Sequence, residues 1–350
     1  MQQVLYAPGL GYYSAGAMKL GAAGDFVTAP EVSALFGRCL AAQCADVLRQ
    51  VGGNTIVEAG AGSGALAADL IGEFPPANYR IVEVSADLRA RQETSLKQKN
   101  AAANTDIQWF DDPGDMEPFD GVIIGNEVID ALPVERFQIV AGQVHALGVI
   151  WNDGRFRIAA RPGDEALSTA VREIESANKF QLPDGYVSEI RPQLHAFIAQ
   201  WAARLNRGAM LWIDYGCSRA ELYARERNRG TLMCHYRHRA HDDPFVYPGL
   251  QDITAWVDFT ALAEAGVASG LQLAGYATQS HFLLGCGIDQ RFDEMRRDIE
   301  DEAQLVSLKA QLRRLMMPGE MGERFRVVAL TRRFDNEMIG FSFRDLAATL

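Results

Sequence analysis

The chain has 350 residues, of which 48% are hydrophobic and 23% are charged, a composition typical of a globular protein with a sizeable core. Its net charge of −11 disfavours nucleic acid as the main partner, and no run of eighteen apolar residues predicts a membrane span. Five scattered cysteines without a C-x-x-C pair favour a reducing compartment, and the start of the chain lacks the features of a secretion signal.

The N-terminal part combines a loop with a helix. Residues 6–30 are rich in Gly, Tyr and Pro and lack periodicity, which predicts an ordered loop; from composition alone, a meandering arm is the simpler explanation. Thr28 and Glu31 have the spacing of a capping box, and an apolar stripe after them predicts the helix. We expect this helix to pack on a sheet and to bring Tyr13, Asp25 and Thr28 to a ligand pocket.

A buried strand, a tight turn and the start of a helix are predicted over residues 54–73. The apolar strand contains Glu58 near its end, and the turn carries alternating glycines at Gly60, Gly62 and Gly64. Glycine lets the chain turn sharply and lets a ligand approach the backbone. The helix start leaves free N–H groups that face such a ligand.

Glu58, the acidic residue before the glycine turn, helps to identify the ligand that the turn binds. Gly60, Gly62 and Ala65 also satisfy the loose dinucleotide fingerprint, so the glycines alone leave NAD open. With Glu58, the segment resembles motif I of class I S-adenosylmethionine (SAM) methyltransferases, in which the acidic residue lies near the amino-acid end of the cofactor. We therefore interpret the ligand as SAM, with NAD and a ligand-free turn as the alternatives.

The next two strands supply candidates for the rest of the ligand. The strand over 79–84 carries Glu83 and Val84 at its end, where Glu83 could accept hydrogen bonds from both ribose hydroxyls. This spacing serves NAD and SAM equally. Asp111 and Asp112 end the third strand, where methyltransferases commonly hold the adenine amino group, although plain turn residues explain them equally well.

The alternation of strands and helices predicts the fold class. It calls for α/β architecture with a doubly wound, mostly parallel sheet and the ligand at the carboxyl ends of its strands. Residues 134–206 interrupt this pattern with an α+β insertion, for which we expect strands at 137–140, 143–147 and 149–151. The sheet resumes over 209–216, and helices near 278–285 and 290–315 precede a last strand.

Two carboxylates follow the fourth strand, at the position that faces the transferred methyl group in this fold. The segment begins Asn126-Glu127, and Asp130 comes three residues later, so a helical turn would place Glu127 and Asp130 on one face. The Asn-Pro-Pro-Tyr motif that marks methylation of planar amino groups is absent. Paired carboxylates suit a guanidinium, although capping of the next element explains the pair nearly as well.

Histidines gather in the segment 230–244. His235, His238 and His241 stand at steps of three beside Cys234, a pattern that raises the possibility of zinc. The interleaved arginines and the lack of a preset ligand scaffold argue against it. We therefore predict no metal, and a polar loop at the active site.

Several of these segments together resemble the MidA-type methyltransferases, whose mitochondrial members are protein-arginine methyltransferases that assist assembly of respiratory complex I. The resemblance covers about residues 6 to 290. The Gly-Asp-Phe-x-Thr-x-Pro-Glu and Asn-Glu-x-x-Asp-Ala-x-Pro motifs are specific, whereas motif I is generic. The matching segments are 11–13, 24–31, 58–64, 83–85, 126–133, 214–216, 230–232 and 251–254.

The resemblance implies a function and a partner. We expect direct SN2-type methyl transfer from SAM to an arginine of a protein, with Glu127 as the main catalytic residue and Asp130 and Asn126 beside it. Asn126 also borders the expected cofactor site. A small-molecule methyltransferase and a non-catalytic SAM-binding assembly chaperone are the alternatives. The protein substrate, the methylation pattern and the oligomeric state, including a homodimer, stay open.

The resemblance also implies an organisation of the chain and a location. The N-terminal segment is shorter than in the family and no mitochondrial presequence is present, which favours a bacterial cytoplasmic member; a eukaryotic one with its presequence removed would lie in the mitochondrial matrix. The expected parts are an N-terminal loop and helix that cover the cofactor site (1–50), a methyltransferase core (51–133 and 207–330), an inserted substrate-side subdomain (134–206) and a C-terminal tail (331–350).

Overall fold

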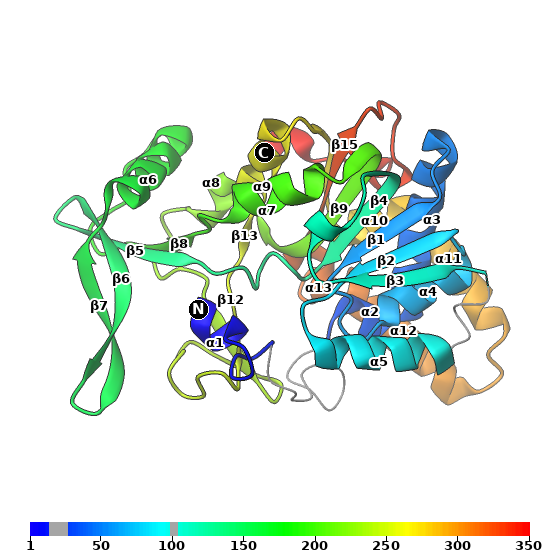
Figure 1. Ribbon diagram of the computed structural model, residues 1–350, viewed down its shortest axis with the longest axis horizontal. Helices are drawn as coiled ribbons and strands as arrows, with labels where there is room; N and C mark the ends of the chain where they lie inside the picture. Colours follow the sequence, from blue (N-terminus) through cyan, green and yellow to red (C-terminus); the bar gives the residue numbers. More distant parts are fainter. Residues whose placement is uncertain (14–26, 99–103) are drawn as a thin grey trace.

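The computed structural model describes residues 1–13, 27–98 and 104–350, and a large twisted sheet forms its centre (Figure 1). The strand order is β14-β15-β9-β4-β1-β2-β3, with β13 beside β9. The strands β3, β2, β1, β4 and β9 run parallel to one another, whereas β15 is antiparallel to both β9 and β14. This confirms the predicted doubly wound, mostly parallel α/β sheet. The bounds are β1 Thr55–Ala59, β2 Asn78–Val82, β3 Asp106–Phe110, β4 Phe119–Asn126, β9 Leu205–Cys217, β13 Val257–Asp258, β14 Gln272–Thr278 and β15 Phe325–Arg332.

Helices cover both faces of this sheet. Successive strand residues point to opposite faces, so Ile56 packs with α3, α4 and α10 while Val57 packs with α7 and α9. Burial on both faces explains why the central strands read as continuous apolar runs. The helix bounds are α1 Gln2–Tyr6, α2 Ala29–Val32, α3 Ala34–Val51, α4 Ala65–Glu73, α5 Ala86–Gln98, α6 Glu165–Asn178, α7 Leu194–Ala202, α8 Arg219–Leu222, α9 Phe259–Ala268, α10 Gln279–Gly285, α11 Ile288–Arg297, α12 Glu302–Met316 and α13 Met321–Arg324, with 3₁₀ turns η1 Pro113–Asp115, η2 Ile339–Phe341 and η3 Ala347–Thr349.

The end of β4 approaches a tryptophan of β9 closely. A Cβ added at Gly125 would lie 2.2 Å from the ring of Trp212, which is fully buried. Trp212 also packs against Trp201 of α7, with 5.9 Å between the ring centroids. Although α7 falls within the range 134–206, its residues join the core of the main sheet. The range 134–206 thus contributes to the main core as well as to the second sheet, and its assignment as an inserted subdomain stays a prediction.

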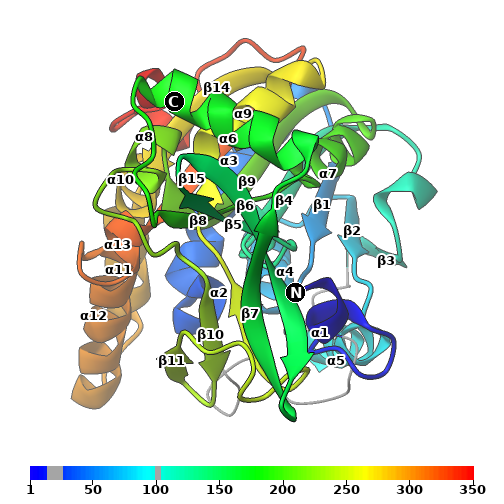
Figure 2. The same ribbon diagram turned by 90° about the vertical axis from the view of Figure 1, so that its left-hand side faces the viewer.

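A second sheet lies beside the main one and stands out from it in Figures 1 and 2. Its order is β7-β6-β5-β8, all antiparallel, and α6 packs against it. The expectation of separate strands at 143–147 and 149–151 is wrong, because Gly148 pairs with Ala159 inside one continuous strand. The bounds are β5 Glu135–Val140, β6 Gln143–Asn152, β7 Arg155–Pro162 and β8 Val187–Ile190.

A small third sheet packs against the N-terminus. Its order is β11-β10-β12, and Cys234 and Ile253 form a buried cluster with Leu5 and Tyr12. The loop expected over 230–244 therefore contains a β-hairpin. The bounds are β10 Met233–Tyr236, β11 Arg239–His241 and β12 Asp252–Thr254.

The C-terminal region differs from expectation in two ways. The helix predicted over 290–315 is divided into α11 and α12, with Asp301 as the N-cap of the second. The tail, about which the sequence said nothing, places Phe334, Met338 and Phe341 in the main core. Among all described helices, none is long and apolar enough to cross a membrane.

Candidate active site

The glycine turn after β1 has the backbone that its sequence predicts. Gly60, Gly62 and Gly64 have φ values of 63°, 55° and 79°, in the left-handed region that favours glycine. The Gly60 N–H donates to the Val82 carbonyl at 2.9 Å and joins the turn to β2. Gly64 is the N-cap of α4, so the start of this helix is adjacent to the pocket.

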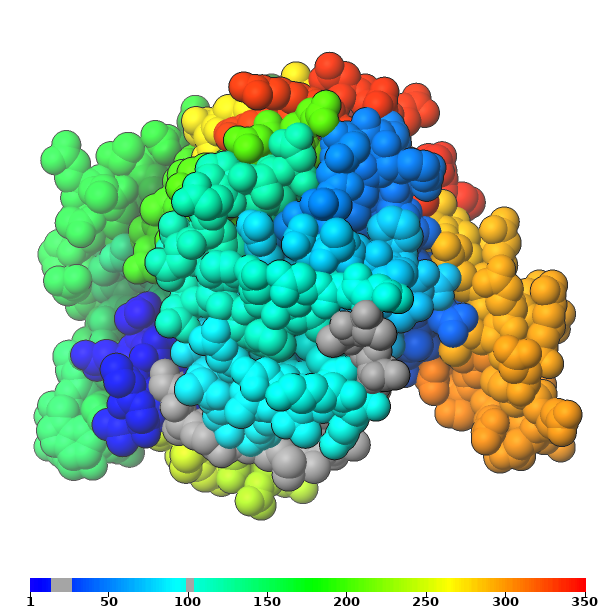
Figure 3. All heavy atoms as spheres, turned by 45° about the vertical axis from the view of Figure 1, so that its right-hand side comes forward, coloured from blue at the N-terminus to red at the C-terminus, as the bar shows by residue number. Residues whose placement is uncertain are grey.

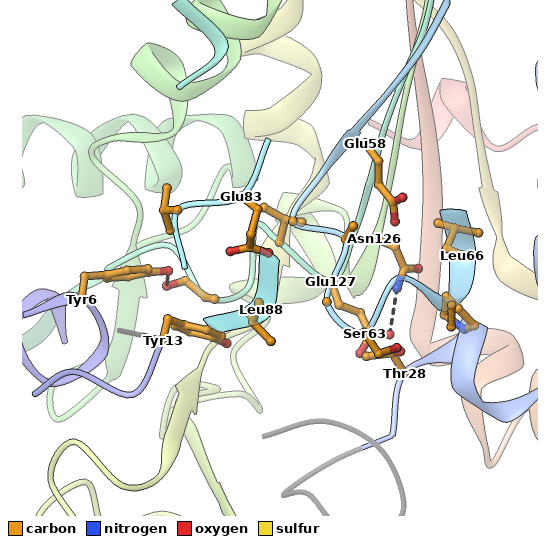
Figure 4. A pocket seen from close by; sticks show the side chains of 18 residues that line it. Tyr6, Tyr13, Thr28, Glu58, Ser63, Leu66, Glu83, Leu88, Asn126 and Glu127 are labelled. Carbon is orange, nitrogen blue, oxygen red and sulfur yellow. Dashed lines mark hydrogen bonds between the residues drawn. The ribbon is translucent and has the colours of Figure 1, made fainter. Parts of the chain in front are cut away.

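A pocket opens at the carboxyl ends of β1, β2 and β4 (Figure 4). It gathers side chains from the glycine turn, the N-terminal segment and the start of α2. Of the predicted cofactor residues, eight line it: Tyr13, Thr28, Glu58, Gly60, Gly62, Glu83, Val84 and Asn126. Asp25 lies outside the described residues. The remaining lining residues are Tyr6, Pro30, Ala61, Ser63, Ala65, Leu66, Leu88, Glu127, Val128 and Ala131.

Glu58 is a buried carboxyl at the floor of this pocket. Its Oε2 accepts a hydrogen bond of 2.6 Å from the Tyr79 hydroxyl. Burial raises the pKa of Glu58 to about 7, and the bond from Tyr79 opposes part of this rise. A sulfonium or ammonium group of a ligand nearby would lower the pKa of Glu58 again, and the ionised carboxylate would then attract that positive charge.

A fully buried glutamine, Gln92 of α5, connects three segments of the site. Its Nε2 donates to Oε2 of Glu83 and to the carbonyl of Gly62, both at 3.0 Å, while its Oε1 accepts from Trp109 at 3.0 Å. The other oxygen of Glu83 accepts from the Ser85 N–H at 2.9 Å. Gln92 thus fixes the Glu83 carboxylate against the glycine turn. Gln92 was not predicted as a site residue, because nothing in a polar helix marks one glutamine as buried.

The two aspartates after β3 lie at the edge of the site. Neither lines the pocket in the described part of the chain. Asp111 pairs with Arg89 at 3.2 Å, and Asp112 accepts bonds of 2.6 Å from the Gly114 N–H and from Gln200. Their assignment to the adenine stays a prediction.

Glu127 lies at the turn after β4 with a strained backbone. Its φ is 54°, unusual for a residue other than glycine. Its Oε1 accepts from Asn126 Nδ2 at 3.1 Å and from the Ala29 N–H of α2 at 3.3 Å. Burial, and then the negative charge of Asp130, raise the pKa of Glu127 to about 8. Figure 4 shows Asn126 and Glu127 joined at the pocket.

Asp130 lies behind the pocket rather than in it. It is 5% exposed and does not line the pocket among the described residues, so the structure brings only Glu127 of the predicted pair to the surface of the cavity. Burial raises the pKa of Asp130, whereas the Tyr215 hydroxyl and the Arg191 charge oppose the rise. The buried Asp214 holds this turn in place, since its Oδ2 accepts from the N–H groups of Ile129 and Asp130 at 2.9 and 3.1 Å.

Two tyrosines of the N-terminal segment form the opposite wall of the pocket (Figure 4). The rings of Tyr6 and Tyr13 stack with 5.5 Å between their centroids. The Tyr6 hydroxyl donates to the Ala131 carbonyl at 3.0 Å, and the Tyr13 hydroxyl donates to Asp252 at 2.9 Å. Tyr6 was not predicted as a site residue. Among the residues that the structure describes, no group of three or more His, Cys, Asp or Glu side chains is placed to hold a metal ion.

The chain belongs to a family of methyltransferases. Residues 39–277 match the family model described as "Putative S-adenosyl-L-methionine-dependent methyltransferase". A crystal structure of a superfamily member from Burkholderia thailandensis bound to S-adenosyl-homocysteine is 42% identical, with a TM-score of 0.92, and the match covers 100% of this chain and 90% of that one. A native structure of a protein from the same organism gives a TM-score of 0.89 at 42% identity.

The chain is also similar to mitochondrial methyltransferases of animals. The mitochondrial protein arginine methyltransferase NDUFAF7 of Danio rerio is 29% identical over 93% of this chain and 80% of its own length. The Homo sapiens protein of the same name is 29% identical over 94% of this chain and 78% of its own length. The chain is a SAM-dependent methyltransferase of the MidA type, as the motifs predicted.

The residues present fit SAM. The pocket has carboxyl groups at Glu58, Glu83 and Glu127, which suit a ligand that carries positive charge. The Oδ1 of Asn126 is buried and has no hydrogen-bond partner among the described residues, so it offers an acceptor to a ligand. We expect the glycine turn and Glu58 to hold the methionine end, and Glu83 the ribose.

The network around Gln92 predicts a loss of cofactor affinity. Gln92→Leu removes the amide that joins Glu83, Gly62 and Trp109, so we expect SAM to bind about tenfold more weakly while the protein stays folded. Calorimetric titration measures the affinity, and Gln108→Leu, an exposed glutamine of β3, is the matched control. Lower thermal stability with unchanged SAM affinity would show that Gln92 serves the fold alone.

The raised pKa of Glu127 predicts the pH dependence of stability in the ligand-free protein. Between its ordinary value of 4.5 and about 8, the folded protein binds more protons at this group than the unfolded chain does. The stabilisation of the folded protein by this group is therefore fully present below pH 4.5 and is lost as the pH rises through about 8. In urea titrations, the free energy of unfolding should decline less over this pH interval for Glu127→Gln than for wild type. The exposed Glu294→Gln should follow wild type. Parallel pH profiles for wild type and Glu127→Gln would contradict the raised pKa.

Proposed function

We propose that this methyltransferase acts on an arginine side chain of a protein. The observation that carries the proposal is the carboxylate of Glu127, which faces the pocket from the turn after β4. A guanidinium keeps its positive charge and offers a planar fork of N–H donors to such a carboxylate. The relatives named protein arginine methyltransferase support the same choice of acceptor.

The mechanism that we propose depends mainly on alignment. SAM, when bound, supplies an electrophilic methyl group that an arginine nitrogen attacks in one SN2-type step. Glu127 orients the guanidinium and draws positive charge away from the attacking nitrogen, which needs no deprotonation beforehand. Holding the acceptor in place removes much of the entropic barrier. Glu127 or water then accepts the proton that the methylated nitrogen releases.

Three neighbours support Glu127 in this proposal. Asn126 and the Ala29 N–H fix one carboxylate oxygen, so the other can turn to the acceptor. Asp130 acts from behind the pocket, where its charge raises the pKa of Glu127 and makes it a better proton acceptor. Asp130 is thus a positioning residue rather than one that touches the guanidinium.

The surrounding parts of the chain take proposed roles as well. The N-terminal range 1–50 contributes Tyr6, Tyr13 and Thr28 to the pocket wall, and we assign it as a cover of the cofactor site. We assign the range 134–206 to the substrate side. Arg191, which follows β8, connects this range to the core, because its guanidinium donates to the carbonyls of Asp130 and Trp256.

Replacing Glu127 tests the proposed function. In transfer of labelled methyl groups from SAM to lysate proteins, Glu127→Gln should lower turnover by roughly 100-fold, because an oriented charge is lost in the transition state. Calorimetric affinity for SAM should change little, and the exposed Glu294→Gln should match wild type in both measurements. Equal losses of turnover and SAM affinity would refute the catalytic role. Wild-type products without methylarginine on amino-acid analysis would refute the acceptor.

A further inference from the structure

Two tyrosine hydroxyls line the pocket on the wall that the N-terminal segment forms. Tyr6 ends α1 and Tyr13 lies in the turn that follows, and their rings stack with 22° between the ring planes. Figure 4 shows both rings with their hydroxyl ends turned toward the interior of the pocket. A ligand therefore meets oxygen atoms on this wall and not ring faces alone.

The protons of both hydroxyls are directed to acceptors of the protein itself. A tyrosine hydroxyl has one proton to donate and lone pairs that accept. The Tyr6 hydroxyl donates to the Ala131 carbonyl, which can only accept, and the Tyr13 hydroxyl donates to Oδ1 of Asp252. Burial raises the pKa of both tyrosines, and the negative charge of Asp252 raises it further, so both stay protonated at neutral pH. Toward a ligand, these two oxygens act as acceptors.

Asp252 fixes the hydroxyl of Tyr13 from the third sheet. This aspartate is 2% exposed, and its Oδ1 also accepts from the N–H of Ile253 at 2.9 Å. Ile253 in turn belongs to the buried cluster that packs against the N-terminal segment. The sequence motifs at 11–13 and 251–254 thus meet at the bond between Tyr13 and Asp252, which gives both motifs a place at the pocket.

The two hydroxyls lie beside the segment that carries Glu127. Ala131, the partner of Tyr6, follows Glu127 by four residues, and both line the pocket. The charge of Asp130, which lies behind this segment, also raises the pKa of Tyr6 and of Tyr13. Figure 3 shows the N-terminal segment, in dark blue, at the surface of the molecule. The tyrosine wall thus stands between the outside and the carboxylate that we assign to the arginine.

A guanidinium needs more acceptors than Glu127 supplies. It presents five N–H donors in one plane, and a donor left without a partner in a buried site costs free energy. One oxygen of Glu127 already accepts from Asn126 and from the Ala29 N–H, so this carboxylate satisfies only part of the guanidinium. Two further acceptor oxygens on the tyrosine wall would satisfy more of it.

We propose that the hydroxyl oxygens of Tyr6 and Tyr13 accept hydrogen bonds from the guanidinium of the substrate arginine, which lies between them and Glu127. The proposal rests on the proposed function, in that the group that receives the methyl is an arginine. It makes the two tyrosines specificity-determining residues, because a wall that only accepts favours a substrate group rich in donors. The N-terminal segment then takes part in substrate choice as well as in covering the cofactor.

Removing each hydroxyl tests this assignment. Tyr6→Phe and Tyr13→Phe keep the stacked rings and lose the oxygens. Each full-length variant is added with labelled SAM to a lysate of cells that lack this protein. We expect labelled methylarginine to form about tenfold more slowly in each variant, because a hydrogen bond to a charged group is lost. Calorimetric SAM affinity should not change, and Tyr247→Phe, at a tyrosine that is 41% exposed, should match wild type in both measurements.

A second variant at position 6 separates substrate binding from anchoring of the N-terminal segment. In Tyr6→4-aminophenylalanine, the amino group donates to the Ala131 carbonyl as the hydroxyl does, but it turns a second N–H toward the pocket in place of an acceptor. We expect this variant to be as slow as Tyr6→Phe. Recovery of the wild-type rate would show that the Tyr6 hydroxyl only anchors the segment, and would overturn its assignment.

The remaining outcomes separate this proposal from the proposed function. Wild-type rates of methylarginine formation in both phenylalanine variants would overturn the hydroxyl assignment and leave the arginine function intact. Loss of SAM affinity in these variants would overturn it too, because the hydroxyls would then bind the cofactor. Labelled products of the wild type that contain no methylarginine would refute the function itself.

Discussion

The site depends on negative charge held where water is scarce. Burial raises the pKa of Glu58, Glu127, Asp130 and Asp214, all near the carboxyl ends of β1, β4 and β9. Ionised carboxylates in such a place need positive charge nearby, and Arg191 supplies only part of it. A cationic cofactor and a cationic acceptor would supply the rest. Ionising these buried carboxyls costs free energy in the ligand-free protein, and we expect the positive charge of the ligands to offset that cost.

The sheet makes this concentration of charge possible. Parallel strands bring their carboxyl ends to one edge, so acidic residues far apart in sequence come to surround one pocket. Buried partners then fix each side chain: Tyr79 holds Glu58, Gln92 holds Glu83, and Asp214 holds the turn that carries Glu127. The same close packing, seen where Gly125 admits Trp212, leaves these groups little freedom to move apart.

The sequence predicted the central sheet and most of the pocket because the signals there are local. Apolar runs punctuated by glycine define β1, β2 and β4, and the acidic residues at their ends follow from the register. Gln92 and Tyr6 were missed because their roles arise from contacts between distant segments. Asp130 was placed beside Glu127 on the assumption of a helical turn, whereas Glu127 has a positive φ of 54° and Asp130 does not line the pocket among the described residues. Gly148 was taken as a break because a single sequence does not show that Ala159 pairs with it.

Calorimetric titration with SAM, S-adenosylhomocysteine and NADH tests the central claim most directly. Titrations at pH 7 in buffers of different ionisation enthalpy also count the protons released on binding. We predict saturable binding of SAM and S-adenosylhomocysteine but not of NADH, with more protons released by the cationic SAM, because its charge favours ionised Glu58 and Glu127. Binding of NADH at comparable affinity, or equal proton release by the two adenosyl ligands, would contradict the claim that buried carboxylates select a cationic cofactor.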